Sequence, residues 1–122
     1  MVKLISFDID GTLDVGDPPG LIPMDLVRQA KHLGCLIGSC SDRLLSDQRR
    51  LWAQQQVNVD FMVLKHRLAE VKARFEADVY YHVGDTDMDY FYARQAGFRF
   101  VKADASVCQV LGSEVLIEAP EP

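Results

Sequence analysis

Residues 1–12 read MVKLISFDIDGT. Residues 1–9 are rich in Val, Leu, Ile and Phe, which predicts a β-strand. Because side chains alternate along a strand, Asp8 and Asp10 are expected to project from the same face. A central strand of a parallel sheet is covered on both faces, so Asp8 is expected to be nearly buried. Two poorly solvated carboxylates repel each other, which predicts a divalent cation beside them, while Gly11 allows a sharp turn.

Downstream of this stretch, apolar runs of strand character alternate with runs of helical spacing. Strands are predicted at residues 35–40, 61–64, 79–83 and 98–101, and helices at 23–33, within 42–56, at 65–75 and at 86–96. The second helix is expected to carry Leu44, Leu45, Gln48, Leu51 and Trp52 on one face. This alternation predicts an α/β fold, a doubly wound three-layer arrangement around a mostly parallel five-stranded sheet.

Two segments fall outside the alternation. Residues 13–22 gather Gly, Pro and Asp, which predicts a loop or a small hairpin. The tail, residues 104–122, is expected to add a short helix and an edge strand at 115–117.

Composition narrows the class of protein. A chain of 122 residues suits one domain, taken as residues 1–122. The net charge of −5 argues against a surface that coats nucleic acid. Apolar runs are too short to span a membrane, and the immediate start of a strand leaves no room for a signal peptide. Cys35, Cys40 and Cys108 show no metal-type pairing, so reduced thiols in a cytoplasmic protein are expected.

Polar residues follow four of the predicted strands. Asp8 and Asp10 follow the first strand, and Ser41, Lys65 and Asp85 follow the second, third and fourth. Open parallel sheets bind ligands beyond the carboxyl ends of their strands, where the strand order reverses. We therefore expect these side chains to form one site.

The segment GDTDMD, residues 84–89, has a structural explanation that covers only part of it. Thr86 is suited to cap the fourth helix, and Asp87 and Asp89 favour its positive end. Asp85 precedes the cap and stays unexplained by helix chemistry, which makes it a candidate ligand.

Ser41 is open to two interpretations. It suits the N-cap of the second helix, and because a helix N-terminus binds anions, it also suits a phosphate contact. Ser39 competes for the second role, although it lies further from the strand end. Arg43 is interpreted as a surface ion pair, with a substrate contact as the alternative.

Lys65 opens the third predicted helix, where its charge opposes the helix dipole. Helix propensity therefore does not explain it, and a role in the site is favoured over that of Lys72. His66 and His82 show no ligand spacing and are assigned only packing or surface roles.

Taken together, the motifs resemble those of the haloacid dehalogenase-like (HAD) phosphohydrolase superfamily. The pattern Asp-x-Asp-Gly-Thr at residues 8–12 resembles motif I, Ser41 motif II, Lys65 motif III, and Asp85 with Asp89 motif IV. The resemblance implies the strand order 5-4-1-2-3. The short gaps between the motifs indicate a member without a cap domain.

The resemblance also implies a reaction. Asp8 would attack phosphorus and form an aspartyl-phosphate, while Asp10 would protonate the leaving oxygen and then take a proton from water. Mg²⁺ would be held by Asp8, by the backbone carbonyl of Asp10 and by Asp85. Asp89 would complete the metal site by orienting a bound water or Lys65.

Phosphoryl oxygens would be held by Ser41, Lys65 and the backbone near Gly11 and Thr12. The expected partner is a phosphorylated substrate. Without a cap, the site is expected to stay open to a bulky substrate or to be covered by a second subunit of a homo-oligomer.

Two other classes compete with the phosphatase. A HAD-fold subunit without catalysis would serve regulation or assembly. A receiver-like module would accept a phosphoryl group on an aspartate after the third strand, but this strand ends at Leu64 and Lys65.

Overall fold

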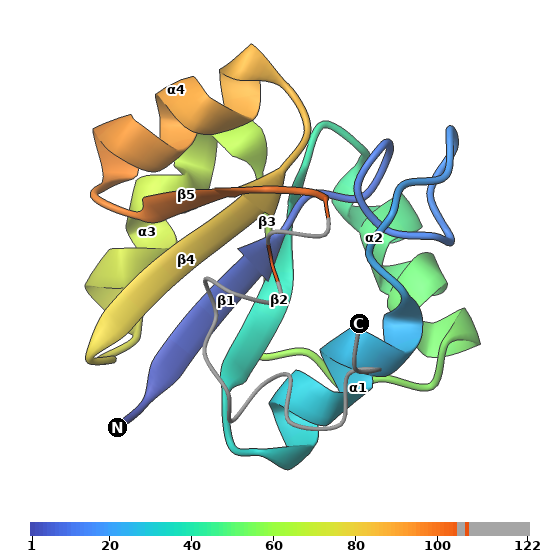
Figure 1. The fold of residues 1–122 in the computed structure, drawn as a ribbon, viewed down its shortest axis with the longest axis horizontal. Helices are drawn as coiled ribbons and strands as arrows, with labels where there is room; N and C mark the ends of the chain where they lie inside the picture. Colours follow the sequence, from blue (N-terminus) through green and yellow to red (C-terminus); the bar gives the residue numbers. More distant parts are fainter. Residues whose placement is uncertain (105–106, 108–122) are drawn as a thin grey trace.

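A computed structural model describes residues 1–104 and residue 107. Its centre is a five-stranded parallel sheet in the order β3-β2-β1-β4-β5 (Figure 1). The strands are β1 (Lys3–Phe7), β2 (Leu36–Ser41), β3 (Phe61–Leu64), β4 (Val79–Gly84) and β5 (Arg99–Lys102). The predicted fold class and strand order are confirmed, since the observed order is the predicted one read from the opposite edge.

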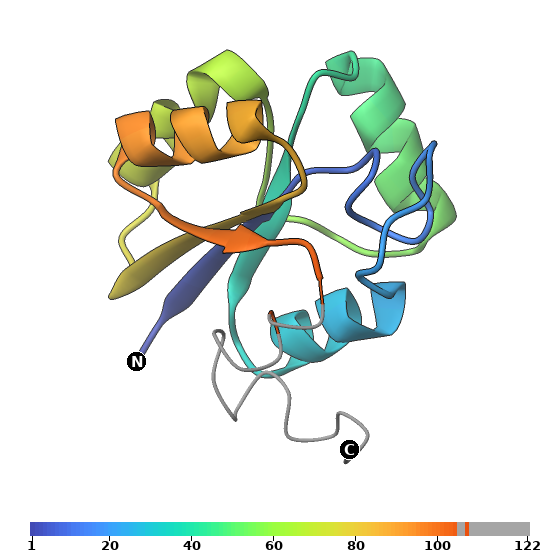
Figure 2. The same ribbon diagram turned by 45° about the horizontal axis from the view of Figure 1, so that its top comes forward.

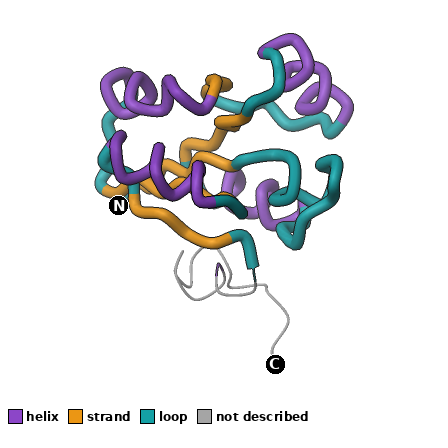
Figure 3. Tube along the Cα trace, turned by 90° about the horizontal axis from the view of Figure 1, so that it is seen from above, coloured by secondary structure: helices purple, strands orange, loops and turns teal. Residues whose placement is uncertain are grey.

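Helices cover both faces of the sheet. On one face lie α1 (Met24–His32) and α2 (Leu45–Gln54). On the other lie α3 (Leu68–Arg74), which follows the short 3₁₀ turn η1 (Lys65–Arg67), and α4 (Asp87–Ala96). Figure 2 shows the sheet between these two layers, and Figure 3 shows the same helices and strands from above. The arrangement buries strand side chains on both faces, as a parallel sheet requires.

Successive side chains of β1 point to opposite faces of the sheet and so belong to two separate hydrophobic clusters. Ile5 and Phe7 face α1 and α2, whereas Leu4 belongs to the cluster under α3 and α4. Trp52, the only tryptophan of the chain, lies in the first cluster and donates its indole N–H to the Ser39 hydroxyl at 2.9 Å. β1 is therefore the middle strand of the sheet, and its side chains are buried on both faces.

Helix α2 lies within the predicted range 42–56, but two of the residues predicted for its apolar face are not buried. Leu44 and Leu45 are 68% and 42% exposed, so their predicted place on the buried face is wrong. The helix starts only after Leu44, whose backbone is not helical (φ −54°, ψ 147°). Gln48, Leu51 and Trp52 are buried as expected.

The start of the second helix also corrects the prediction for Ser41. This residue ends β2 and does not cap α2, which has Leu44 at its N-cap and no side-chain cap hydrogen bond. The cap role of Ser41 is therefore wrong.

The end of β4 follows the prediction closely. Thr86 and Asp89 form a capping box at the start of α4, and Gly97 ends this helix in the left-handed conformation (φ 79°). The predicted third helix is divided into η1 and α3.

The connection from β1 to α1 is an irregular loop, as predicted for residues 13–22, and an isolated bridge joins Leu13 to Ile22. Within the described residues no helix combines the length and the apolar character needed to cross a membrane. The elements expected in the tail, and Cys108, lie outside the described residues.

Candidate functional site

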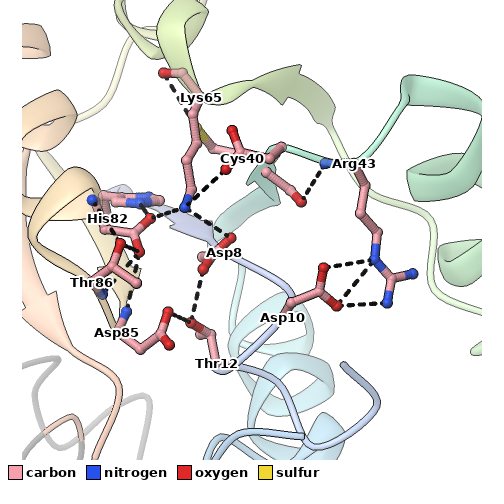
Figure 4. A network of polar contacts seen from close by, with 12 residues as sticks. Asp8, Asp10, Thr12, Cys40, Arg43, Lys65, His82, Asp85 and Thr86 are labelled. Carbon is pink, nitrogen blue, oxygen red and sulfur yellow. Dashed lines mark hydrogen bonds and ion pairs between the residues drawn. The ribbon is translucent and has the colours of Figure 1, made fainter. Parts of the chain in front are cut away.

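Several of the predicted site residues meet at the carboxyl edge of the sheet (Figure 4). Asp8 directly follows β1, and its N–H extends the ladder to the carbonyl of Val83 at 2.9 Å. Lys65 follows β3, and Asp85 follows β4. Asp8 and Lys65 are buried, whereas Asp85 is exposed. The position of β1 inside the sheet brings these side chains together.

Lys65 is the cation of this edge. Its Nζ lies 3.4 Å from Asp89 Oδ1, 3.7 Å from Asp42 Oδ2 and 3.8 Å from Asp8 Oδ1. Burial lowers the pKa of Lys65, but the charges of these three carboxylates raise it above its usual value. A charged lysine is therefore fixed beside Asp8. The competing Lys72 donates instead to the carbonyl of Gly97 at 3.1 Å.

Asp8 is a carboxylate in a poorly solvated position. Burial is the main cause that raises the pKa of Asp8 to about 8, and the negative charge of Asp89 adds to it. The positive charge of Lys65 acts in the opposite direction and offsets only part of the increase. The Thr12 hydroxyl lies 3.4 Å from Asp8 Oδ2 and 3.4 Å from Asp85 Oδ1. Without a further positive charge, Asp8 therefore keeps its proton at neutral pH.

Three carboxylates are close enough to share a cation. Asp8, Asp85 and Asp89 each offer one oxygen, and these oxygens lie within 4.8 Å of one another. Carboxylate oxygens are the ligands that Mg²⁺ and other hard divalent cations prefer. A divalent cation at this position would stabilise the ionised form of the buried Asp8. The three carboxylates are therefore a donor set that fits a divalent cation.

Gly11 allows this cluster to form. Its φ is +77°, and a Cβ at this position would lie 2.1 Å from Asp85 Oδ2. The loop after β1 therefore approaches Asp85 as closely as the absence of a side chain permits.

Asp89 is held by the protein on both of its oxygens. Oδ1 faces Lys65 and contacts His82 Nε2 at 2.9 Å. Oδ2 accepts from the Thr86 hydroxyl at 2.9 Å and from the N–H groups of Asp85 and Thr86 at 3.2 Å each. Burial acts to raise its pKa, but the hydrogen bond and charge of His82, with those of Lys65 and Thr86, lower the pKa of Asp89 to about 2.

Asp10 departs from the expected geometry. β1 ends at Phe7, so the strand alternation that predicts a common face for Asp8 and Asp10 does not extend to Asp10. Its carboxylate points to Arg43 (Figure 4), which donates from Nη2 at 2.7 Å and from Nε to both oxygens at 3.1 Å. Asp10 Oδ1 also accepts from the N–H of Asp17 at 2.8 Å. The ion pair predicted for Arg43 is therefore confirmed, and its partner is the predicted acid.

This pairing has an electrostatic consequence for Asp10. The hydrogen bonds from Arg43 hold the pKa of the Asp10 carboxyl below its ordinary value, against the opposing effect of burial. The carboxylate is therefore ionised at neutral pH and is not among the oxygens that converge beside Asp8.

The two serines of β2 have different surroundings. The Ser39 hydroxyl donates to Gln48 Oε1 at 2.6 Å and accepts from Trp52, which places it in the core. The Ser41 hydroxyl accepts from the N–H of Arg43 at 3.0 Å. Ser41, at the strand end, is the serine that stays a candidate phosphate contact.

The backbone amides expected to hold phosphate are used within the loop. The N–H of Gly11 donates to the carbonyl of Pro18 at 2.7 Å, and that of Thr12 donates to Ile9 at 3.1 Å. These two amides would have to leave their partners to bind a phosphoryl oxygen. The Thr12 hydroxyl, by contrast, already lies between Asp8 and Asp85.

For His82 the sequence predicts only a packing or surface role. It is fully buried in β4, with Nδ1 2.9 Å from the Ser6 hydroxyl and Nε2 on Asp89. A useful signal was the spacing: His82 lies two residues before Gly84 in an apolar strand, so it shares a strand face with the start of the motif. His66 is exposed.

Two surface hollows are lined in part by residues of the contacts described above. One, of about 280 Å³, is lined by Val15, Arg43, Asp47, Arg50, Leu51, Gln54 and Gln55. The other, of about 230 Å³, is lined by Asp85, Thr86, Asp87, Tyr90, Phe100 and Lys102. The first hollow includes Arg43 of the Asp10 ion pair, and the second includes Asp85 and Thr86.

No model of a known protein family matches the chain, and no curated protein matches it. The class defined by the structure is thus a doubly wound α/β fold with a lysine and a carboxylate cluster at the carboxyl edge of its sheet.

Proposed function

We propose that this chain is a Mg²⁺-dependent phosphatase that hydrolyses a phosphate monoester through an aspartyl-phosphate on Asp8. The observation that carries the proposal is the juxtaposition of a charged lysine with a buried aspartate that could share a cation with its neighbours. Phosphoryl transfer depends mainly on positioning and on neutralising charge, and this edge of the sheet supplies both. The HAD resemblance of the motifs points to the same reaction.

The reaction has two displacements. In the first, an Asp8 oxygen forms a bond to phosphorus as the bond to the leaving oxygen breaks. The leaving oxygen takes a proton from Asp10, which is ionised while it is paired with Arg43 and must first take up that proton from solvent. In the second, water attacks phosphorus, the bond to Asp8 breaks, and the proton of the water passes to Asp10. Inorganic phosphate is the product, and Asp8 and Asp10 return to their starting states.

The charged groups have separate tasks in this scheme. Mg²⁺, held by Asp8 and Asp85, would neutralise the charge of the phosphoryl oxygens and lower the pKa of Asp8. Lys65 would neutralise a second side of the phosphoryl group, because its Nζ already lies 3.8 Å from Asp8. Ser41 would donate its hydroxyl to a third oxygen. Asp89 would hold Lys65 in place, because both of its oxygens are bound within the protein.

Asp10 must change partners before it can act as the acid. In the structure it is bound by Arg43 and by the N–H of Asp17. A substrate that takes up the Arg43 guanidinium would release the carboxylate towards the leaving oxygen. Arg43 is thereby placed to contact substrate as well as Asp10.

The same ion pair supports a second candidate function. With Asp10 held by Arg43, Asp8 could accept a phosphoryl group that water then removes slowly, as in a regulatory or binding subunit. A HAD-fold module of this kind would use Lys65 and the carboxylates for binding alone.

The test is hydrolysis of p-nitrophenyl phosphate with and without Mg²⁺. We expect Mg²⁺-dependent turnover that Asp8→Asn reduces about a thousandfold or more, because the nucleophile is lost. Asp85→Asn is expected to raise the Mg²⁺ concentration needed for half activity. Asp87→Asn is the matched control, since this exposed acid lies outside the carboxylate cluster.

Each outcome separates the candidates. Absence of turnover from folded protein in any divalent metal would overturn the phosphatase. Uptake of beryllofluoride by wild type but not by Asp8→Asn would then support the slowly released phosphoryl group of the second candidate.

A further inference from the structure

A buried chain of hydrogen bonds runs from β1 through β4 to α4. Ser6 and His82 stand opposite each other in the register of the two strands, and Asp89 lies in the first turn of α4. All three residues are fully buried. The Ser6 hydroxyl lies 2.9 Å from His82 Nδ1, and His82 Nε2 lies 2.9 Å from Asp89 Oδ1. The imidazole is therefore held at both ring nitrogens.

The direction of one of these bonds follows from chemistry. An ionised carboxylate only accepts hydrogen bonds, so Nε2 of His82 carries a proton and donates it to Asp89. The same oxygen of Asp89 faces Lys65 Nζ at 3.4 Å. The other oxygen of Asp89 is taken by the backbone and hydroxyl donors of residues 85–86.

We infer that His82 is a positioning residue, which fixes the Asp89 carboxylate through its Nε2–H and thereby sets Lys65 beside Asp8. This inference rests on the proposed function only in that Lys65 serves the phosphoryl group. Among the described contacts of Asp89 Oδ1, the only side-chain partners are His82 and Lys65. Without the imidazole, the lysine and the carboxylate would lose their common orientation.

Two substitutions separate this role from simple packing. His82→Gln can place an amide N–H where Nε2–H lies, whereas His82→Asn can place one only near Nδ1. Both variants keep a polar group in the strand, so a packing role predicts similar losses in the two. A positioning role predicts that glutamine rescues the site and asparagine does not.

The first readout is amide hydrogen exchange of the metal-free protein, which needs no activity. Asp89 accepts from the N–H groups of Asp85 and Thr86, so a loosened carboxylate exposes them. We expect about tenfold faster exchange of these two amides in His82→Asn and near wild-type exchange in His82→Gln. Equal exchange in wild type and His82→Asn would overturn the inference, whether or not the protein hydrolyses phosphate.

The second readout is hydrolysis of p-nitrophenyl phosphate with Mg²⁺. Loss of an outer hydrogen-bond partner of a site typically costs tenfold to a hundredfold, which is the fall in kcat/KM expected for His82→Asn. His82→Gln is expected to stay within about threefold of wild type. Equal falls in both variants, in step with equal losses of thermal stability, would assign His82 to packing alone. No turnover by wild type would count against the phosphatase and leave the exchange result to decide on His82.

Discussion

The ends of β4 and β1 use the same residue types in different ways. Both strands lie side by side in the sheet and run into a segment of Gly, Asp and Thr. After β4 the chain enters α4 at once, and Thr86 and Asp89 close the turn between them. After β1 the chain runs through an irregular loop until Met24, and Asp10 finds its partner in Arg43, 33 residues away.

The difference lies in how far along the chain each carboxylate finds its donors. Asp89 accepts from residues three and four positions before it and from His82 in the adjoining strand. Asp10 depends on a guanidinium from another element and on a loop amide. We expect a carboxylate whose donors are close in the sequence to be fixed, and one whose donors come from distant segments to exchange partners.

The largest effect is expected for the metal-free protein as pH rises. The folded-state pKa of Asp8, about 8, lies above the ordinary unfolded value, so the folded protein holds a proton that the unfolded chain has released. The free energy of unfolding should fall between about pH 4 and pH 8, by ~1.4 kcal/mol per pH unit at most. Asp8→Asn should remove this slope and be more stable than wild type at pH 8. Urea unfolding in chelator at several pH values measures both, with Asp87→Asn as the control that keeps the slope.

Gly11→Ala should be the most damaging change in the β1 loop. The left-handed backbone costs about 1–2 kcal/mol for alanine, and the added Cβ also displaces Asp85. Gly34→Ala is the matched control, because its φ is +93° with no atom within 4 Å of a Cβ. Both variants should lose stability in urea unfolding, but only Gly11→Ala should lose Mg²⁺-dependent turnover. A fully active Gly11→Ala protein would contradict the close approach to Asp85.

Thr86→Ala tests the local closure of the β4 turn. The lost capping box should cost about 1 kcal/mol of unfolding free energy. Thr86→Ser keeps the hydroxyl and should recover most of the loss. Chemical denaturation of the three proteins provides the measurement, and an alanine variant as stable as wild type would show that the box contributes nothing.

The smallest effect on stability is expected for the long-range pair. Arg43→Gln removes a partly exposed ion pair, so the free energy of unfolding should change by less than about 1 kcal/mol. Calorimetry can compare this variant with Arg50→Gln, which removes an exposed pair with Asp47. A decrease of several kcal/mol in the free energy of unfolding would mean that Arg43 holds Asp10 as firmly as its neighbours hold Asp89.

Sequence reasoning predicted the fold where the signal was local or periodic. Apolar runs with intervening helical spacing located the five strands, and the capping box spacing located the start of α4. The lysine that opposes a helix dipole was expected near Asp8, and Lys65 lies there.

The remaining features depend on contacts that spacing does not reveal. A common strand face for Asp8 and Asp10 requires the first strand to continue past Asp8, but β1 ends at Phe7. The predicted cap at Ser41 failed because α2 starts four residues later, at Leu45. His82 acquires its partners from β1 and α4, so only the sheet register shows its role.

The indole of Trp52 provides an internal optical reporter. It is the single tryptophan, 2% exposed, and packed with α1 and α2 on the sheet face opposite α3 and α4. Its emission should shift to longer wavelength when the core opens to water. Fluorescence from one residue thus reports whether each substituted protein still holds its sheet and α2 together, and a variant that keeps the wild-type emission while losing turnover has been damaged in its chemistry and not in its fold.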